Sequence, residues 1–108
     1  MARTAKRLFG PGLLTAAAVT KYTVPTSTKT IIRHFRINNV TASAANVTIS
    51  IGADAAGTEI VTALSIASNS IVDHYGYWVM DAAEILQALS GTASAINLSA
   101  YGDEITLG

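Results

Sequence analysis

The chain of 108 residues has no cysteine, two prolines, two histidines and only 13% charged residues. Without cysteine it can form neither a disulfide framework nor a thiolate metal site, so its stability must come from packing and from subunit contacts. The patterns of a nucleophile elbow, a His-Glu-x-x-His zinc site, a P-loop and a Rossmann glycine loop are all missing. The sequence therefore predicts a protein that is not an enzyme and that uses no cofactor and no metal.

The two histidines are the remaining candidates for chemistry. His34 and His74, with Asp73 beside the second, could approach each other across a sheet and hold a metal ion or a proton. Each lies in an expected strand beside aromatic or charged residues, where a histidine usually bonds to a neighbour or faces solvent. These surroundings favour a structural role for both.

Long apolar runs are also lacking. The longest uncharged stretch, residues 37–53, contains Asn, Ser and Thr and alternates in polarity, which is unlike a helix in lipid. The glycines and proline at residues 10–12 interrupt the apolar start of the chain, which argues against a cleaved secretory signal. A membrane is therefore not an expected partner.

What the sequence does contain is a large share of Ala, Val, Ile, Thr, Ser and Asn in short segments of alternating polarity. Strands are expected at residues 13–24, 30–39, 47–51, 59–66, 71–80, 95–100 and 104–107, with turn signals between them. The pattern predicts an all-β fold: an antiparallel β-sandwich or small barrel of the jelly-roll or immunoglobulin-like type. Residues 13–108 are expected to form this single β domain.

Two segments allow more specific interpretations. Asn-Val-Thr occurs at residues 39–41 and again at 46–48, and the small residues between the copies predict a hairpin whose strands end at Asn39 and restart at Asn46. In the segment 30–39, Phe35 marks the expected core face and Arg33 is a misfit on it. Gly76 predicts a β-bulge in the segment 71–80.

Residues 81–89 are open to two interpretations. Asp81 and Glu84 have the spacing of a capping box, and Ile85 and Leu89 lie four apart, which favours a helix. The same residues are also compatible with a strand.

Residues 1–12 have the features of an extended N-terminal arm. Its charge comes from three basic residues and its apolar tip from two large side chains, and Gly-Pro-Gly ends it. Because arms of this kind dock on neighbouring subunits, five residues are the predicted assembly contacts of a homo-oligomer: Arg3, Lys6, Arg7, Leu8 and Phe9.

Aromatic residues are few, but three of them lie close together at Tyr75, Tyr77 and Trp78. Their setting favours packing in the core and on the sheet surface. If they prove exposed beside polar groups, they favour instead a carbohydrate-binding module for host recognition.

The charges are strongly divided along the chain. All seven basic residues lie at or before Arg36, and all seven acidic residues lie at or after Asp54, so the net charge is zero. One interpretation is that strands from the two halves are neighbours and pair their surface charges. The other is that the basic half of one subunit faces the acidic half of the next. The neutral total argues against nucleic acid as the main partner.

Five stretches of the sequence resemble the small all-β virion structural proteins of tailed bacteriophages. They span about residues 8–105: LFGPGLL, KYTVPTSTKTIIRHFRINN, VTISIGADAAGTEI, IVDHYGYWVMDAAEILQAL and GTASAINLSAYGDEI. The most specific parts are YTVP, ISIGADAAGT and GTASA, which are scaffold and turn motifs. Ala83 departs from the resembling proteins, which tend to have glycine there, and the resemblance favours a strand or an irregular turn at 81–89.

The resemblance implies a place in the virion, with other copies of the chain and other virion proteins as partners. Such proteins are often described as minor tail proteins, which implies a tail-associated role. A capsid decoration or head accessory protein is the alternative within the same class.

Overall fold

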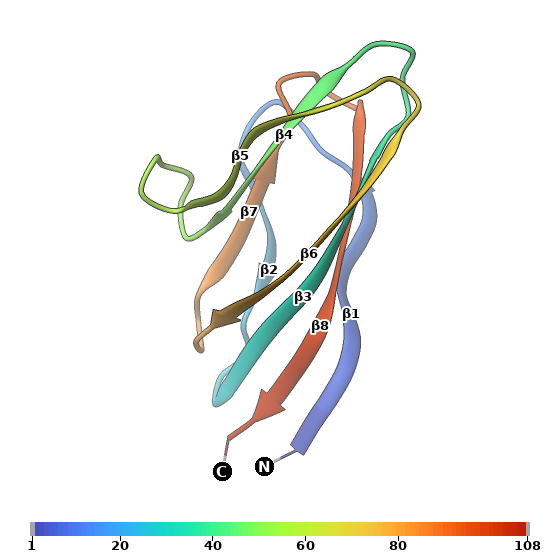
Figure 1. The fold of residues 1–108 in the computed structure, drawn as a ribbon. Helices are drawn as coiled ribbons and strands as arrows, with labels where there is room; N and C mark the ends of the chain where they lie inside the picture. Colours follow the sequence, from blue (N-terminus) through green and yellow to red (C-terminus); the bar gives the residue numbers. More distant parts are fainter. Residues whose placement is uncertain (1, 108) are drawn as a thin grey trace.

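A computed structural model describes residues 2–107 as eight strands in two antiparallel sheets, which confirms the predicted β-sandwich (Figure 1). One sheet has the order β1-β8-β3-β6 and the other the order β2-β7-β4-β5. The part of the chain from residue 2 to residue 107 has no helix that is long and apolar enough to cross a membrane. The strands are β1 (Ala2–Leu13), β2 (Val19–Thr23), β3 (Thr28–Asn39), β4 (Ala45–Ile51), β5 (Glu59–Ile66), β6 (Ile71–Met80), β7 (Ile85–Leu89) and β8 (Ile96–Thr106).

The strand order is that of a jelly roll. The chain is folded in half, because β1 pairs with β8, β2 with β7, β3 with β6 and β4 with β5. This long double strand then rolls up, so that β3 also pairs with β8 and β4 with β7. Two packed sheets result, with free edges rather than a closed barrel.

The core lies between the two sheets and is built mainly from branched aliphatic side chains. In β4 the predicted alternation places Val47 and Ile49 in the core without any exposure, while Ile51 packs against it from the edge. The other large side chains that are fully buried are Leu14, Val24, Ile32, Phe35, Ile37, Ile66, Met80, Leu86, Ile96 and Leu98.

The expected N-terminal arm is a strand of the sandwich. Residues 2–13 form β1, which pairs with β8 from Ala2 opposite Thr106 to Leu13 opposite Asn97. Gly10-Pro11-Gly12 does not end the segment, because the register shifts there and a proline is tolerated in an edge strand. The described part of the predicted arm, residues 2–12, is thus an edge strand of the β domain.

The prediction of a hairpin at residues 36–52 is wrong. β3 ends at Asn39 in one sheet and β4 begins at Ala45 in the other, so the loop between them crosses the sandwich. The buried Asn39 amide fixes this crossing: its nitrogen donates to the carbonyls of Ser43 and Ile66, and its oxygen accepts from Thr41.

A β-bulge explains why Arg33 is not a misfit in the core. The registers of β3 with both β6 and β8 shift between Ile32 and His34, so Arg33 projects outward beside His34. On β6 the extra residues opposite this point are Gly76 and Tyr77, where the sequence predicted a bulge.

The segment 81–89 is a turn followed by strand β7. The backbone amide of Asp81 donates to the Glu84 side chain at 2.5 Å, as in a capping box. Ala83, however, has a φ of 70°, which a helix does not allow, and its amide donates to the Val24 carbonyl. The strand interpretation is therefore confirmed for Ile85–Leu89.

Candidate assembly surface

The ion pairs follow from the folded-in-half topology. Every ion pair between residues 2 and 107 joins a residue at or before Arg36 to one at or after Asp73. Since β1 and β3 carry basic residues and pair with β8 and β6, most basic residues of the first half find an acidic partner in the second half of the same chain. The prediction that strands of the two halves are neighbours is confirmed.

Asp103 of β8 is the centre of the most compact charge cluster on the outer face of the first sheet. Its carboxylate accepts hydrogen bonds of 2.7 Å from both Arg33 and Arg3, and it is almost buried beneath them. The Arg33 guanidinium, and after it that of Arg3, lowers the pKa of the Asp103 carboxyl.

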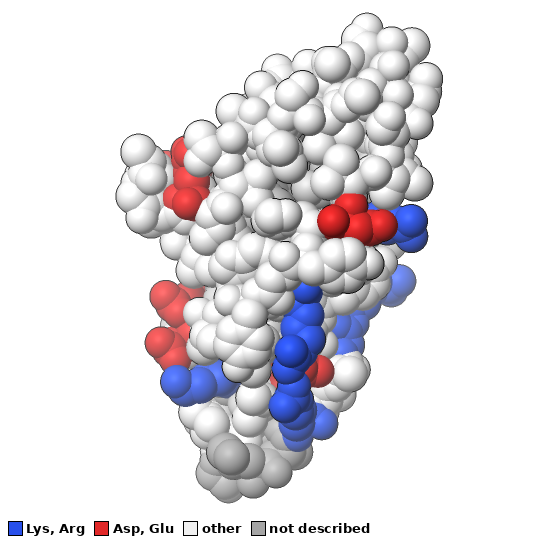
Figure 2. Space-filling view, in the orientation of Figure 1, with Lys and Arg blue, Asp and Glu red and all other residues white. Residues whose placement is uncertain are grey.

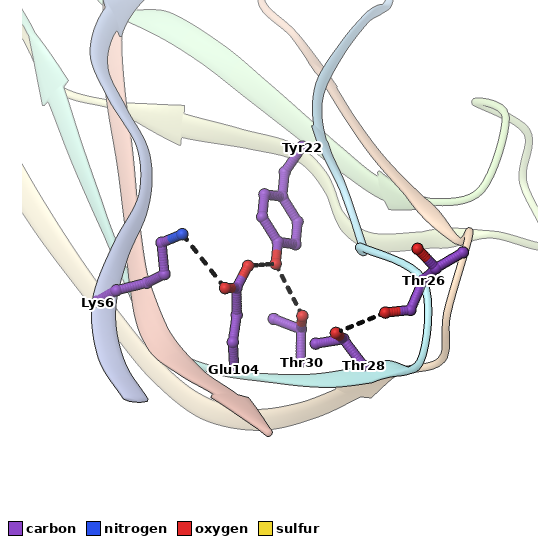
Figure 3. Close-up of polar contacts among 6 residues, drawn as sticks. All are labelled: Lys6, Tyr22, Thr26, Thr28, Thr30 and Glu104. Carbon is purple, nitrogen blue, oxygen red and sulfur yellow. Dashed lines mark hydrogen bonds and ion pairs between the residues drawn. The ribbon is translucent and has the colours of Figure 1, made fainter. Parts of the chain in front are cut away.

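A second polar cluster joins the two sheets at one end of the sandwich (Figure 3). The Tyr22 hydroxyl of β2 donates a hydrogen bond to Glu104 of β8, and Thr30 Oγ1 lies 2.8 Å from the same hydroxyl. Lys6 Nζ lies 3.2 Å from the other Glu104 oxygen. Burial, and then the bond to Glu104, raise the pKa of Tyr22 to about 12.

A row of large side chains crosses the outer face of the first sheet. The row runs from Arg7 of β1 through Tyr101 of β8 and His34 of β3 to Tyr75 of β6, each opposite the next in register. The His34 ring stacks on Tyr75 at 4.4 Å between centroids and on Tyr101 at 5.4 Å. His34 Nε2 also lies 2.8 Å from Asp73 Oδ1, which holds the ring in the row.

The aromatic residues of β6 divide between the two faces of the sheet. Tyr75 is 70% exposed and Tyr77 is 63% exposed, whereas Trp78 packs against the core and Phe35. The Trp78 ring lies over Gly76, where an added Cβ would meet it at 2.5 Å. The expectation of core and surface packing therefore fits Trp78, and the two tyrosines are open to solvent.

The two histidines do not form a site together. His34 belongs to the outer row, and His74 lies beside Trp78 with ring centroids 5.4 Å apart. No group of three or more His, Cys, Asp or Glu side chains between residues 2 and 107 could hold a metal ion.

An open groove of about 380 Å³ lies next to the aromatic row. Asn97 lines it, and its Oδ1 atom is buried without a hydrogen-bond partner among the described residues. The other lining residues are Pro11, Arg36, Asn38, Ile71, Ser99 and Tyr101.

The predicted assembly contacts occupy different places from those expected of an arm. Arg3 and Lys6 pair with acids of β8 in their own subunit. Leu8 is part of the core, and Phe9 packs against the core at the edge. Arg7 is exposed and makes no ion pair with a residue of the described chain.

Sequence reasoning missed Tyr22 and Glu104, because no local motif marks either residue. The two residues are 82 positions apart and come from different sheets, so only the topology brings them together. The division of charge between the halves is the one feature that hinted at partners for the β8 acids.

No family model and no curated protein matches the chain. A chain solved in work on Bacillus endospore appendages, described as a family of disulfide-linked pili, is similar in structure with a TM-score of 0.60. The similarity covers 98% of this chain and 89% of that chain, at 16% sequence identity. At this identity the comparison shows a shared fold.

The two proteins differ in whether disulfides can link their subunits. The pili are described as disulfide-linked, but the present chain has no cysteine. Copies of this 108-residue chain therefore cannot be joined to one another by disulfides.

Proposed function

We propose that the protein is a non-enzymatic structural subunit that assembles with copies of itself, as a tail-associated component of a tailed bacteriophage virion. The proposal has a general part, self-assembly, and a specific part, the place in the particle. The general part draws on the surface of the sandwich, and the specific part draws on the sequence resemblance to phage virion proteins.

The observation that carries the general part is the exposed edge strand β6. Between residues 2 and 107, β6 has a hydrogen-bonded neighbour on one side only, β3. Four of its five outward-facing side chains are exposed apolar or aromatic residues: Ile71, Tyr75, Tyr77 and Val79. A long edge strand with an apolar face and no proline or lysine is a surface on which another chain can pair.

The similar chain supports the same class of role. It comes from appendages described as pili. The phage proteins that the sequence resembles are also structural, so the similar structure and the sequence resemblance both favour an assembling subunit over an enzyme.

The general part is tested by measuring the mass of the purified protein over a wide concentration range with analytical ultracentrifugation. Self-assembly predicts a discrete oligomer or a growing series of oligomers. A chain that stays monomeric up to millimolar concentration would refute it.

The specific part is tested by locating the chain in images of the intact particle. A tail-associated protein is expected in a small number of copies around the tail or its tip. A capsid decoration protein, the alternative placement, is expected in many copies on the shell. Absence from the particle contradicts both placements.

A second candidate function is favoured by the exposure of two aromatic rings beside polar groups. Tyr75 and Tyr77 are open to solvent, and polar residues such as Asn38 and Ser99 line the nearby groove. Aromatic faces beside polar groups suit sugar rings, so a host-recognition module that binds carbohydrate is the alternative. It predicts binding on a glycan array that is lost in Y75A, and an array without any hit contradicts it.

A further inference from the structure

Two basic residues remain after the internal ion pairs are formed, and both lie on the same side of the sandwich. Arg7 of β1 and Lys21 of β2 make no ion pair within residues 2–107. Their strands are the edges of the two sheets on one side. Lys21 lines a groove of about 270 Å³ together with residues 9–12 of β1 and Leu98.

The acids that remain lie on other strands and loops. Asp54, Glu59 and Glu84 make no ion pair within the described chain. Glu59 begins β5, an edge strand on the opposite side, Asp54 lies in the loop before it, and Glu84 lies in the turn after β6. Figure 2 shows acidic side chains predominating along the margin of β5 and that turn, and basic side chains along the margin of β1.

The register of the second sheet places Lys21 and Glu59 at about the same level along the strand direction, on opposite edges of the sheet. Thr20, next to Lys21, is opposite Gln87, which is opposite Ser50, which is opposite Glu59. One row of paired residues therefore begins beside Lys21 at one edge and ends at Glu59 at the other.

A row of paired residues also joins the two edges of the first sheet. Its aromatic row begins at Arg7 on β1 and ends at Tyr75 on β6. A guanidinium that meets a tyrosine ring face makes a favourable cation–π contact, and Asp73 lies two residues from Tyr75.

The strand directions also match. β1 runs opposite to β6, because three successive antiparallel pairings separate them, and β2 runs opposite to β5 for the same reason. Two copies placed side by side in the same orientation therefore set β1 antiparallel to β6 and β2 antiparallel to β5. Both sheets then continue from one copy into the next with the strand direction that antiparallel pairing requires.

We propose that the β1/β2 edge of one copy docks on the β5/β6 edge of the next, with Lys21 facing Glu59 and Arg7 facing Tyr75. This interface rests on the proposed self-assembly and names its geometry. It is a head-to-tail contact, so its repetition gives a ring where the rotation between copies closes and a filament where it does not.

A two-fold contact between like edges is less favourable. Two β1/β2 edges would bring the unpaired Arg7 and Lys21 of both copies together. In β1, the register shifts and Pro11 restrict regular pairing to residues 2–7, which is the part that carries the basic side chains. The partner edge that suits this stretch carries acidic and aromatic groups, as the β5/β6 edge does.

The first test reverses the charge of one edge at a time. In the R7E/K21E variant both edges are acidic, and in the D54K/E59K variant both are basic. Each variant alone is expected to assemble at least about tenfold more weakly than the wild type. An equimolar mixture is expected to regain assembly, because each acidic edge then meets a basic one. Circular dichroism melts check that both variants are folded.

The second test uses the absence of cysteine. One row of paired residues crosses the first sheet from Ala5 on β1 to Val79 on β6, through Asp103 and Ile31. In the proposed interface, A5C of one copy should therefore lie opposite V79C of the next. Mixed A5C and V79C chains are expected to form a disulfide-linked heterodimer under mild oxidation. The matched control, A5C with I71C, should not cross-link, because Ile71 lies about 26 Å away along β6.

The outcomes separate this interface from the general proposal. If the wild type assembles but the reversed variants assemble equally well, or if V79C links mainly to itself, the head-to-tail interface is wrong and self-assembly stands. If the wild type is monomeric at every concentration, self-assembly itself fails.

Discussion

Replacing Gly102 with alanine tests the register at the centre of the first sheet. Gly102 of β8 is buried opposite Ile32, where the register of β3 shifts. A Cβ built on Gly102 would lie 2.0 Å from the carbonyl oxygen of Ile31 and 3.0 Å from Ile32 Cα. Both atoms belong to the backbone of a central strand, so no side chain can turn aside to make room.

The cost follows from that geometry. The two strands must move apart by at least about 1 Å to reach van der Waals contact. Overpacking of this kind costs about 1–3 kcal/mol, and each ladder hydrogen bond that lengthens adds about 0.5–1.5 kcal/mol. We therefore expect G102A to lower the free energy of unfolding by about 3 kcal/mol, which lowers the Tm by about 12–24 °C.

Thermal unfolding followed by circular dichroism measures the effect. The matched control is G57A, because a Cβ at Gly57 meets no atom within 4 Å. That variant should lie within about 0.5 kcal/mol of the wild type. If G102A melts within about 2 °C of the control, then β3 and β8 do not approach as described and the register is wrong.

Three further predictions concern single groups. Because the pKa of Tyr22 rises from 10.0 to about 12 on folding, its stabilisation is complete below pH 10 and is lost as the pH rises through 12. After allowance for solvent screening at this partly exposed ring, we expect the stabilisation to contribute about 1 kcal/mol to the free energy of unfolding. In a pH titration followed by absorbance at 295 nm, Y22F should lack the phenol ionisation that occurs at the highest pH. Because the pKa of Asp103 is lowered from 3.8, its stabilisation is present above that pH and is lost as the pH falls through the lowered value. D103N should therefore flatten the acid limb of a plot of Tm against pH, and an unchanged limb would contradict the role of the two arginines. A83G should be about 1 kcal/mol more stable than A82G in urea unfolding, because of these two alanines Ala83 alone has a positive φ. Equal stabilities would refute the strain.

The fold class could be predicted because it depends on local alternation. Val47 and Ile49 show the period of a half-buried strand, and no stretch of the chain has the period of a long helix. The divided charges also predicted that the two halves are neighbours, since strands that pair in register bring opposite charges together.

The pairing partners could not be predicted from local pattern. The loop from Val40 to Ala44 suits a hairpin and a crossing between sheets equally well, and the crossing is decided by the buried hydrogen bonds of Asn39. Pro11 indicated the end of an arm, but the free side of an edge strand needs no amide donor there.

The candidate site was predicted only in part. Of the five predicted contacts, Arg7 is exposed and makes no ion pair within residues 2–107, whereas Leu8 is buried in the core. Whether Arg7 contacts another copy stays a prediction. Lys21 and Glu59 were not identified, because their common height becomes visible only when four strands are placed in register.

The pairing of β1 with β8 also has a consequence for timing during synthesis. Of the eight strands described, β1 is made before the other seven, but its only partner strand within residues 2–107, β8, is made after them. Contacts between segments so distant along the chain form late, so the sandwich cannot be completed before β8 has been made. The proposed docking edge of β1 and β2 therefore forms only after β8 has been made, so a growing assembly cannot bind this edge before that point.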